Sequence, residues 1–128
     1  MREHTAEWIA KAEEDMTVAE WLQQAPRGMP APIVFHCQQC IEKYLKAVLV
    51  EGQLSVPHSH DLILLTNLVA GRVDFDAGLR EQIRAITAFA VESRYPGFDV
   101  IDSDAQDALQ ACRRIRHQLR RYLALPEA

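Results

Sequence analysis

Five arginine or histidine side chains recur near the C-terminal end of the chain at spacings that place them on one side of a helix. They are Arg113, Arg114, His117, Arg120 and Arg121. At about 100° per residue they fall within an arc of roughly 120°. Such a stripe could contact the phosphates of a nucleotide or an RNA. We favour the alternative that these arginines complement the helix dipole and pair with the N-terminal segment, whose first 25 residues hold six acids against two bases.

A second group of polar residues shares one side of the segment 35–50. Its members are His36, Gln39, Glu42, Lys43 and Lys46. Glu42 and Lys46 lie four residues apart with the acid first, which is the better orientation for a stabilising pair on a helix. The simplest interpretation is a solvated face. Phe35 and Val50 interrupt it with apolar groups, which suggests a partner surface, and we therefore expect a homodimer.

Cys37 and Cys40 form a CxxC motif, which raises the question of redox or zinc chemistry. A thioredoxin-like site requires a βαβ setting, and a zinc site requires two more ligands, for which His58 and His60 are the candidates. Cys37 falls on the apolar stripe of its helix with Ile41, where a cysteine usually acts as a small hydrophobe. We therefore expect no bound metal and no cofactor.

Two further motifs stand near helix ends. His60-Asp61 precedes an apolar helical pattern, so Asp61 is expected to cap that helix and His60 to be a buried hydrogen-bonding residue. Arg94 lies just before Pro96, where an arginine can bind the last carbonyl groups of a helix. If Arg94 and His60 converge with Lys43 or Lys46, they would form an anion pocket.

The elements that must position these residues are five helices. Apolar residues recur at three- and four-residue steps, and no segment alternates with period two. The expected helices run from a cap at Thr5 to Pro26, over 30–52, over 60–70, over 76–93, and from a cap at Ser103 or Asp104 to a stripe ending at Leu119 and Tyr122. This pattern predicts one all-α domain over 1–128, an up-and-down antiparallel helical bundle of four to five helices.

Composition narrows the class of protein. The 128 residues are 48% hydrophobic and 25% charged, which is ordinary for a globular protein. The formal charge of −4 argues against a protein coated by nucleic acid but allows a local basic face. We see no signal peptide and no apolar run of the ~20 residues that a membrane span needs. With three cysteines and no secreted disulfide pattern, a cytoplasmic protein is expected.

Four short motifs occur in order along the chain: FHCQQ at 35–39, EKYLKA at 42–47, SHDL at 59–62 and SRYP at 93–96. In order and spacing they resemble the HEPN domain family (higher eukaryote and prokaryote nucleotide-binding). The resemblance implies a compact helical bundle, often dimeric, that binds a nucleotide or RNA. It also implies a minimal nucleotidyltransferase as partner, in a pair that looks like a toxin–antitoxin system.

Several HEPN branches are metal-independent ribonucleases, which carry an arginine, four to six further residues and then a histidine. That spacing is missing at every histidine here, and the nearest approach is Arg113 with His117, three residues between. We therefore expect a binding module rather than an enzyme, the alternative being a ribonuclease that uses Arg113 and His117. The expected ligand-binding residues are Lys43, Lys46, His60, Arg94, Arg120 and Arg121.

Overall fold

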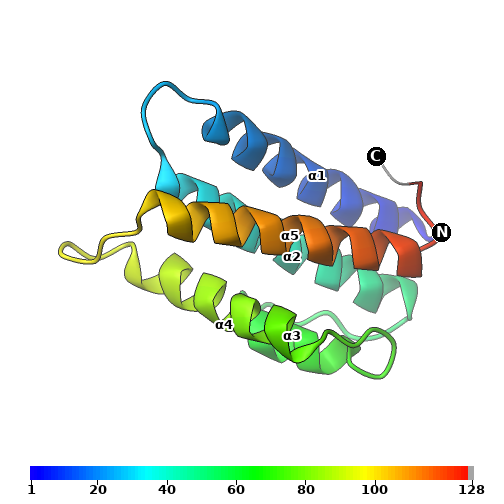
Figure 1. The fold of residues 1–128 in the computed structure, drawn as a ribbon. Helices are drawn as coiled ribbons and strands as arrows, with labels where there is room; N and C mark the ends of the chain where they lie inside the picture. The colour runs from blue at the N-terminus through cyan, green and yellow to red at the C-terminus, as the bar shows by residue number, and fades with distance from the viewer. Residues whose placement is uncertain (127–128) are drawn as a thin grey trace.

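The computed structural model describes residues 1–126, and this part of the chain contains five helices and no strand (Figure 1). The helices are α1 (Glu3–Gln23), α2 (Pro30–Glu51), α3 (Leu62–Val69), α4 (Ala77–Glu92) and α5 (Asp102–Tyr122). The all-α prediction is confirmed.

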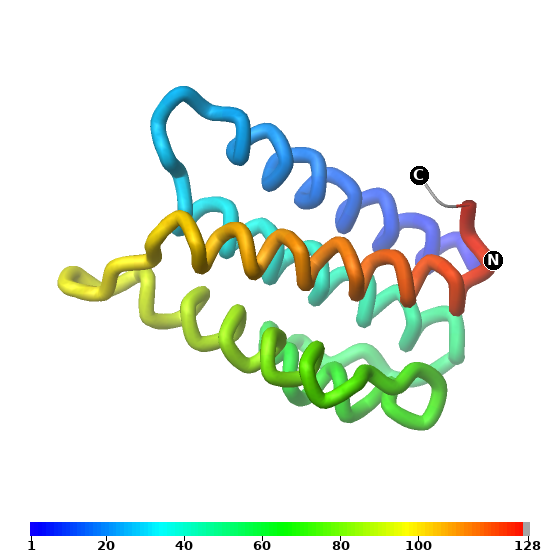
Figure 2. The backbone as a smooth tube through the Cα atoms, viewed as in Figure 1, coloured from blue at the N-terminus to red at the C-terminus, as the bar shows by residue number. Residues whose placement is uncertain are grey.

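The four long helices lie side by side as an up-and-down bundle, with neighbours along the chain running in opposite directions (Figure 2). α2 is central, because it contacts each of the other four helices. In the view of Figure 1, α5 crosses in front of α2 and runs in the same direction, with α1 on one side and α4 on the other. The short α3 packs against α2 and α4.

The expected cap at Asp61 is present, and Asp76 caps a second helix in the same way. The Asp61 carboxylate accepts hydrogen bonds from the amides of Ile63 and Leu64, and the Asp76 carboxylate accepts one from Leu79. Each side chain thereby satisfies amides that have no partner within the helix. α3 consequently begins at Leu62, two residues after the expected start.

The expected caps of α1 and α5 are wrong. α1 already begins at Glu3, and Thr5 is fully buried inside it, donating its hydroxyl to Glu51 Oε1 at 2.9 Å. α5 begins at Asp102, one or two residues early, and Asp104 lies within its first turn. There Asp104 reaches back and accepts the Ile101 amide at 3.0 Å. In both cases the polar side chain makes a hydrogen bond, but its residue lies within the helix and not at the cap position.

The core stripe of α2 is placed as the sequence predicts: Cys37, Ile41, Tyr44, Leu45 and Val48 are all buried. Cys40 and Cys112 are buried as well, and all three cysteines are free thiols. Hydrogen bonding of the Cys112 thiol to Cys37 and Cys40, together with burial, raises the pKa of Cys112 well above its ordinary value. A neutral buried thiol packs as a small apolar group, and it is unreactive because the thiolate is the nucleophile.

Within residues 1–126, no helix is long and apolar enough to cross a membrane.

Candidate nucleic-acid interface

The inner face of α5 presents two arginines to α1 and α2. Arg116 donates from Nε and Nη2 to the two carboxylate oxygens of Glu13, at 2.7 and 2.5 Å. The Tyr44 hydroxyl donates to Glu13 Oε2 at 2.7 Å and accepts from Arg120 Nη1 at 3.0 Å. The Arg116 hydrogen bond lowers the pKa of Glu13. Burial, followed by the bond to Glu13, raises the pKa of Tyr44.

Arg120 is fixed by these contacts. Besides Tyr44, it donates from Nε and Nη2 to the Pro126 carbonyl oxygen, at 2.9 and 2.7 Å, and only 9% of the residue is exposed. A phosphate would have to displace these partners within the protein. The buried position of Arg120 therefore removes it from the candidate site.

The outer face of α5 carries the remaining basic residues of the stripe. Arg113, Arg114, His117 and Arg121 line one open groove of about 830 Å³, where α5 passes the start of α4 at Asp76. Arg113 and His117, one turn apart, both belong to it. The groove is shallow and open to solvent along the helix, a shape that admits a chain of nucleotides.

The ion pairs in this groove are weak. Arg113 Nη2 lies 3.4 Å from Glu20 Oε2, and Arg114 Nη2 lies 3.3 Å from Asp76 Oδ2, with about half of each side chain exposed. Exposed pairs of this kind contribute roughly 0–1 kcal/mol, so a phosphate can compete with the carboxylates. Arg121 is exposed and makes no ion pair with the described residues 1–126.

Tyr122 also lines the groove, which the sequence did not lead us to expect. It was assigned to the core stripe of its helix, yet the structure leaves it 43% exposed. The helix ends at Tyr122, and the next residue, Leu123, takes the core position. The exposed position of Tyr122 could have been predicted from the spacing, because Tyr122 follows Gln118 by four residues and so lies on the same outer face of the helix. The groove therefore pairs an aromatic ring with cationic side chains.

The polar face of α2 is not solvated, contrary to expectation. Lys43 Nζ donates to Asp15 Oδ2 at 2.6 Å, and His36 Nδ1 lies 2.8 Å from the other oxygen of Asp15. Lys46 Nζ donates to Glu42 Oε2 at 3.1 Å, with both residues buried.

α1 covers this face of α2. Asp15 supplies the carboxylate for Lys43, and the ring of Trp8 lies 5.3 Å from Lys46 Nζ. The two lysines are thus neutralised within the protein, so neither is presented to a phosphate.

His60 and Arg94 do converge, at a smaller hollow between α2 and α4. The expectation that His60 is buried is wrong, because 80% of its side chain is exposed; it nevertheless makes the expected hydrogen bond, with Nδ1 3.0 Å from Glu42 Oε1. Lys43 does not line this hollow, and Lys46 lies behind Glu42.

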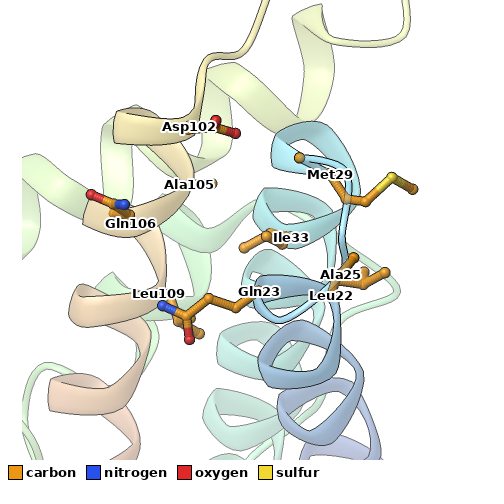
Figure 3. A pocket seen from close by; sticks show the side chains of 10 residues that line it. Leu22, Gln23, Ala25, Met29, Ile33, Asp102, Ala105, Gln106 and Leu109 are labelled. Carbon is orange, nitrogen blue, oxygen red and sulfur yellow. The ribbon is translucent and has the colours of Figure 1, made fainter.

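Another hollow, of about 270 Å³, lies where the segment 22–29 meets the start of α5 (Figure 3). In the close-up, Leu22 and Ile33 stand across from Asp102 and Leu109 of α5. Gly28 is so close to Asp102 that a Cβ atom there would lie 2.8 Å from its Oδ1. The carboxylate makes this hollow unsuitable for an anion.

No group of three histidine, cysteine or acidic residues within 1–126 is arranged to hold a metal ion. Cys37 and Cys40 are sealed in the core, whereas His60 is turned toward Glu42. The four side chains considered for zinc therefore do not meet.

The fold and the groove on the outer face of α5 together define a small all-α binding module with a cationic surface groove. The chain belongs to the HEPN domain family: the family model, described as HEPN domain, matches residues 5–122. Membership supports a nucleotide- or RNA-binding module in general.

Among solved structures, the chain is similar to TT1696 from Thermus thermophilus, with a TM-score of 0.81 and 18% identity. The match covers 94% of this chain and 99% of that one, and at this identity it supports the fold alone. A comparison with curated proteins gives no match.

Proposed function

We propose that this protein binds single-stranded RNA along the outer face of α5. The observation that carries the proposal is the convergence of Arg113, Arg114, His117 and Arg121 with Tyr122 in one groove. Phosphates would lie on the guanidinium groups and a base would stack on the exposed tyrosine ring. This combination of a basic track with an aromatic platform suits single strands, whose bases are free to stack.

The test is fluorescence anisotropy with a labelled single-stranded RNA. Arg121→Ala should weaken binding several-fold, because it removes a guanidinium that no carboxylate of the described chain neutralises. The matched control is Arg84→Ala on α4, which removes the same charge from an exposed side chain outside the groove. Equal losses in the two variants would mean that only net charge matters and would overturn the proposal.

We propose binding without cleavage. A ribonuclease is the second candidate, since Arg113 and His117 share the groove. Only three residues separate Arg113 from His117, however, whereas the ribonuclease branches of the family have four to six between the two residues. RNA incubated in EDTA with the wild type or with His117→Ala should remain intact in both cases. Cleavage that the substitution abolishes would make the ribonuclease the leading function.

A minimal nucleotidyltransferase, in a toxin–antitoxin-like pair, is the partner that we propose on the basis of family membership. The pair would work in the cytoplasm, a compartment that suits three free, buried thiols. Co-expression with the product of a neighbouring reading frame should give a complex that survives gel filtration. Separate elution of the two purified proteins at micromolar concentration would contradict the pairing.

We also propose that the module is a homodimer. Val50 is half-buried, so of the two residues that suggested a partner surface only Phe35 is exposed. α3 offers a better apolar surface, because Leu64 and Leu68 lie one turn apart and are 40% and 43% exposed. Light scattering should return twice the chain mass of 14.5 kDa, and Leu68→Glu should return the monomer. A monomeric wild type would refute the dimer.

A further inference from the structure

The hollow where the segment 22–29 meets the start of α5 has largely apolar walls (Figure 3). Its volume of about 270 Å³ is just below the roughly 300–1,000 Å³ that small-molecule sites occupy. The apolar residues that line it come from the end of α1 and the loop after it, from the start of α2 and from α5: Leu22, Ala25, Met29, Ile33, Ala105 and Leu109. The hollow therefore suits a small ligand with an apolar stem.

One charged group accompanies these apolar walls. Among the described residues that line the hollow, Asp102 alone is charged, and it is exposed. Within residues 1–126 its carboxylate makes no ion pair and no hydrogen bond. The start of α5 does not need Asp102 as a cap, because Asp104 already accepts the Ile101 amide. The Asp102 carboxylate is therefore available to a cation from solution.

The Asp102 carboxylate lies against the backbone of Gly28. A Cβ atom on residue 28 would lie 2.8 Å from Oδ1 and 3.3 Å from Oδ2 of Asp102, so glycine leaves the room that the carboxylate occupies. In the close-up, the Asp102 side chain points from α5 toward the segment around Met29 (Figure 3). Arg27, beside Gly28 in the chain, does not line the hollow. The negative charge thus lies between two of the segments that form the walls.

Gln106 supplies a second acceptor. It follows Asp102 by four residues, so the two side chains share one face of α5, and both line the hollow. Within the described part of the chain the Gln106 side chain makes no hydrogen bond, which leaves its amide oxygen to accept one. A primary ammonium donates up to three hydrogen bonds and carries the charge that a carboxylate attracts. Two acceptors next to an apolar surface are therefore suited to an alkylammonium group.

From this arrangement we propose that the hollow binds a primary ammonium carried on a short apolar stem. The ammonium lies on Asp102 and Gln106, and the stem lies against Leu22, Ile33 and Leu109. A free alkylamine and the lysine side chain of another protein present the same chemistry. The site shares no residue with the groove on α5 and prefers the opposite charge, so it stands or falls independently of the proposed RNA binding.

Titration of the ¹⁵N-labelled protein with isopentylamine, followed by NMR, tests the site directly. The amide signals of Gly28 and Ala105 should shift saturably in the millimolar range, as expected for so small a ligand. Isopentyl alcohol, which has the same stem without the charge, should bind about tenfold more weakly. Asp102→Asn should weaken amine binding about tenfold, whereas Asp107→Asn, on the same helix outside the hollow, should not. Absence of saturable shifts, or equal affinity in Asp102→Asn, would overturn the proposal.

A pair of glycine variants tests the position of the carboxylate with every charge retained. Gly28→Ala places a Cβ where the Asp102 carboxylate lies and should weaken isopentylamine binding several-fold. Gly71→Ala is the matched control, because a Cβ at that position meets nothing within 4 Å. Circular dichroism confirms that each variant is folded. If Gly28→Ala binds the amine as the wild type does, the carboxylate does not act from this position and the assignment is wrong.

Competition separates the two sources of the ammonium. The blocked tripeptide Gly-Lys-Gly is compared with its norleucine counterpart, which keeps the apolar stem and lacks the ammonium. Displacement of isopentylamine by the lysine peptide alone would extend the site to a lysine of a partner protein. Displacement by neither would restrict the site to free amines. Equal displacement by both would show that the ammonium is not recognised and would overturn the proposal, while leaving RNA binding by the α5 groove unaffected.

Discussion

The two faces of α5 carry the same residue type in opposite settings. On the inner face, Arg116 and Arg120 are bonded to Glu13 and Tyr44 and are largely buried. On the outer face, Arg113 has one long, exposed ion pair, and Arg121 has none within the described chain. What separates the two sets is the position of one carboxylate, Glu13 of α1, and not the arginines themselves.

This contrast separates the arginines of α5 that stabilise the fold from those that are available to bind a ligand. An inner arginine has exchanged its hydration for fixed partners, so releasing it would leave buried polar groups unsatisfied. An outer arginine remains hydrated and is only weakly paired, so it can exchange a carboxylate or a counterion for a phosphate. We therefore expect inner substitutions to affect folding and outer substitutions to affect binding.

The largest effect is expected for Arg120→Ala. It removes the donor to Tyr44 and both donors to the Pro126 carbonyl from a buried site. Breaking a buried charged contact costs about 3 kcal/mol, so the free energy of unfolding should fall by about that amount. Urea denaturation of this variant and its neighbour Arg121→Ala measures the contrast. A loss in Arg120→Ala as small as in Arg121→Ala would contradict the division.

Glu13→Gln should have the next largest effect, with a defined pH dependence. Because Arg116 lowers the folded-state pKa of Glu13 below 4.5, the native state binds fewer protons than the unfolded state in acid. The stabilisation by the carboxylate is therefore complete above about pH 4.5 and is lost as the pH falls through the lowered pKa. At neutral pH the variant should be less stable by about 2 kcal/mol.

The matching measurement is urea denaturation of both proteins from neutral pH to below pH 4. The difference in unfolding free energy between the wild type and Glu13→Gln should shrink as the solution becomes more acidic. A constant difference over that range would show that the Glu13 charge does not contribute.

Tyr44→Phe should have a smaller effect on the same inner face. The hydroxyl links Arg120 to Glu13, and its removal leaves the Arg116 bonds to Glu13 in place. The expected destabilisation is about 1 kcal/mol, the usual net contribution of one hydrogen bond. Thermal denaturation can resolve it. RNA affinity should equal that of the wild type, and a drop in affinity would place the inner face in the binding site.

The smallest effect on stability is expected for Arg121→Ala. An exposed side chain without an ion pair should change the unfolding free energy by less than about 0.5 kcal/mol. The same substitution should give the clearest loss of RNA binding among the variants of α5. Destabilisation comparable to Arg120→Ala would mean that Arg121 has a structural partner.

Periodicity was sufficient to predict the bundle and its core. Apolar spacing placed Ile41 and Leu45 in the interior, and Asp61 was correctly expected to cap a helix. These features depend on local spacing, which a single sequence contains in full.

Tertiary packing determined what the sequence could not show. Glu42 and Lys46 have the spacing of a surface pair, yet α1 and Trp8 cover them. A helical wheel gives the angle between Arg120 and Arg121 but not the direction in which the neighbouring helix lies. The same limit explains why Tyr122 was assigned to the core.

The most direct test of the account is the salt dependence of RNA affinity in the neighbouring variants Arg120→Ala and Arg121→Ala, each verified as folded by circular dichroism. Each phosphate contact on a single strand contributes about 0.7 to the slope of log affinity against log salt. We predict that Arg121→Ala reduces the magnitude of the slope by about that amount, whereas Arg120→Ala retains the wild-type slope. A slope reduced in Arg120→Ala and unchanged in Arg121→Ala would contradict the assignment of the outer face of α5 to binding.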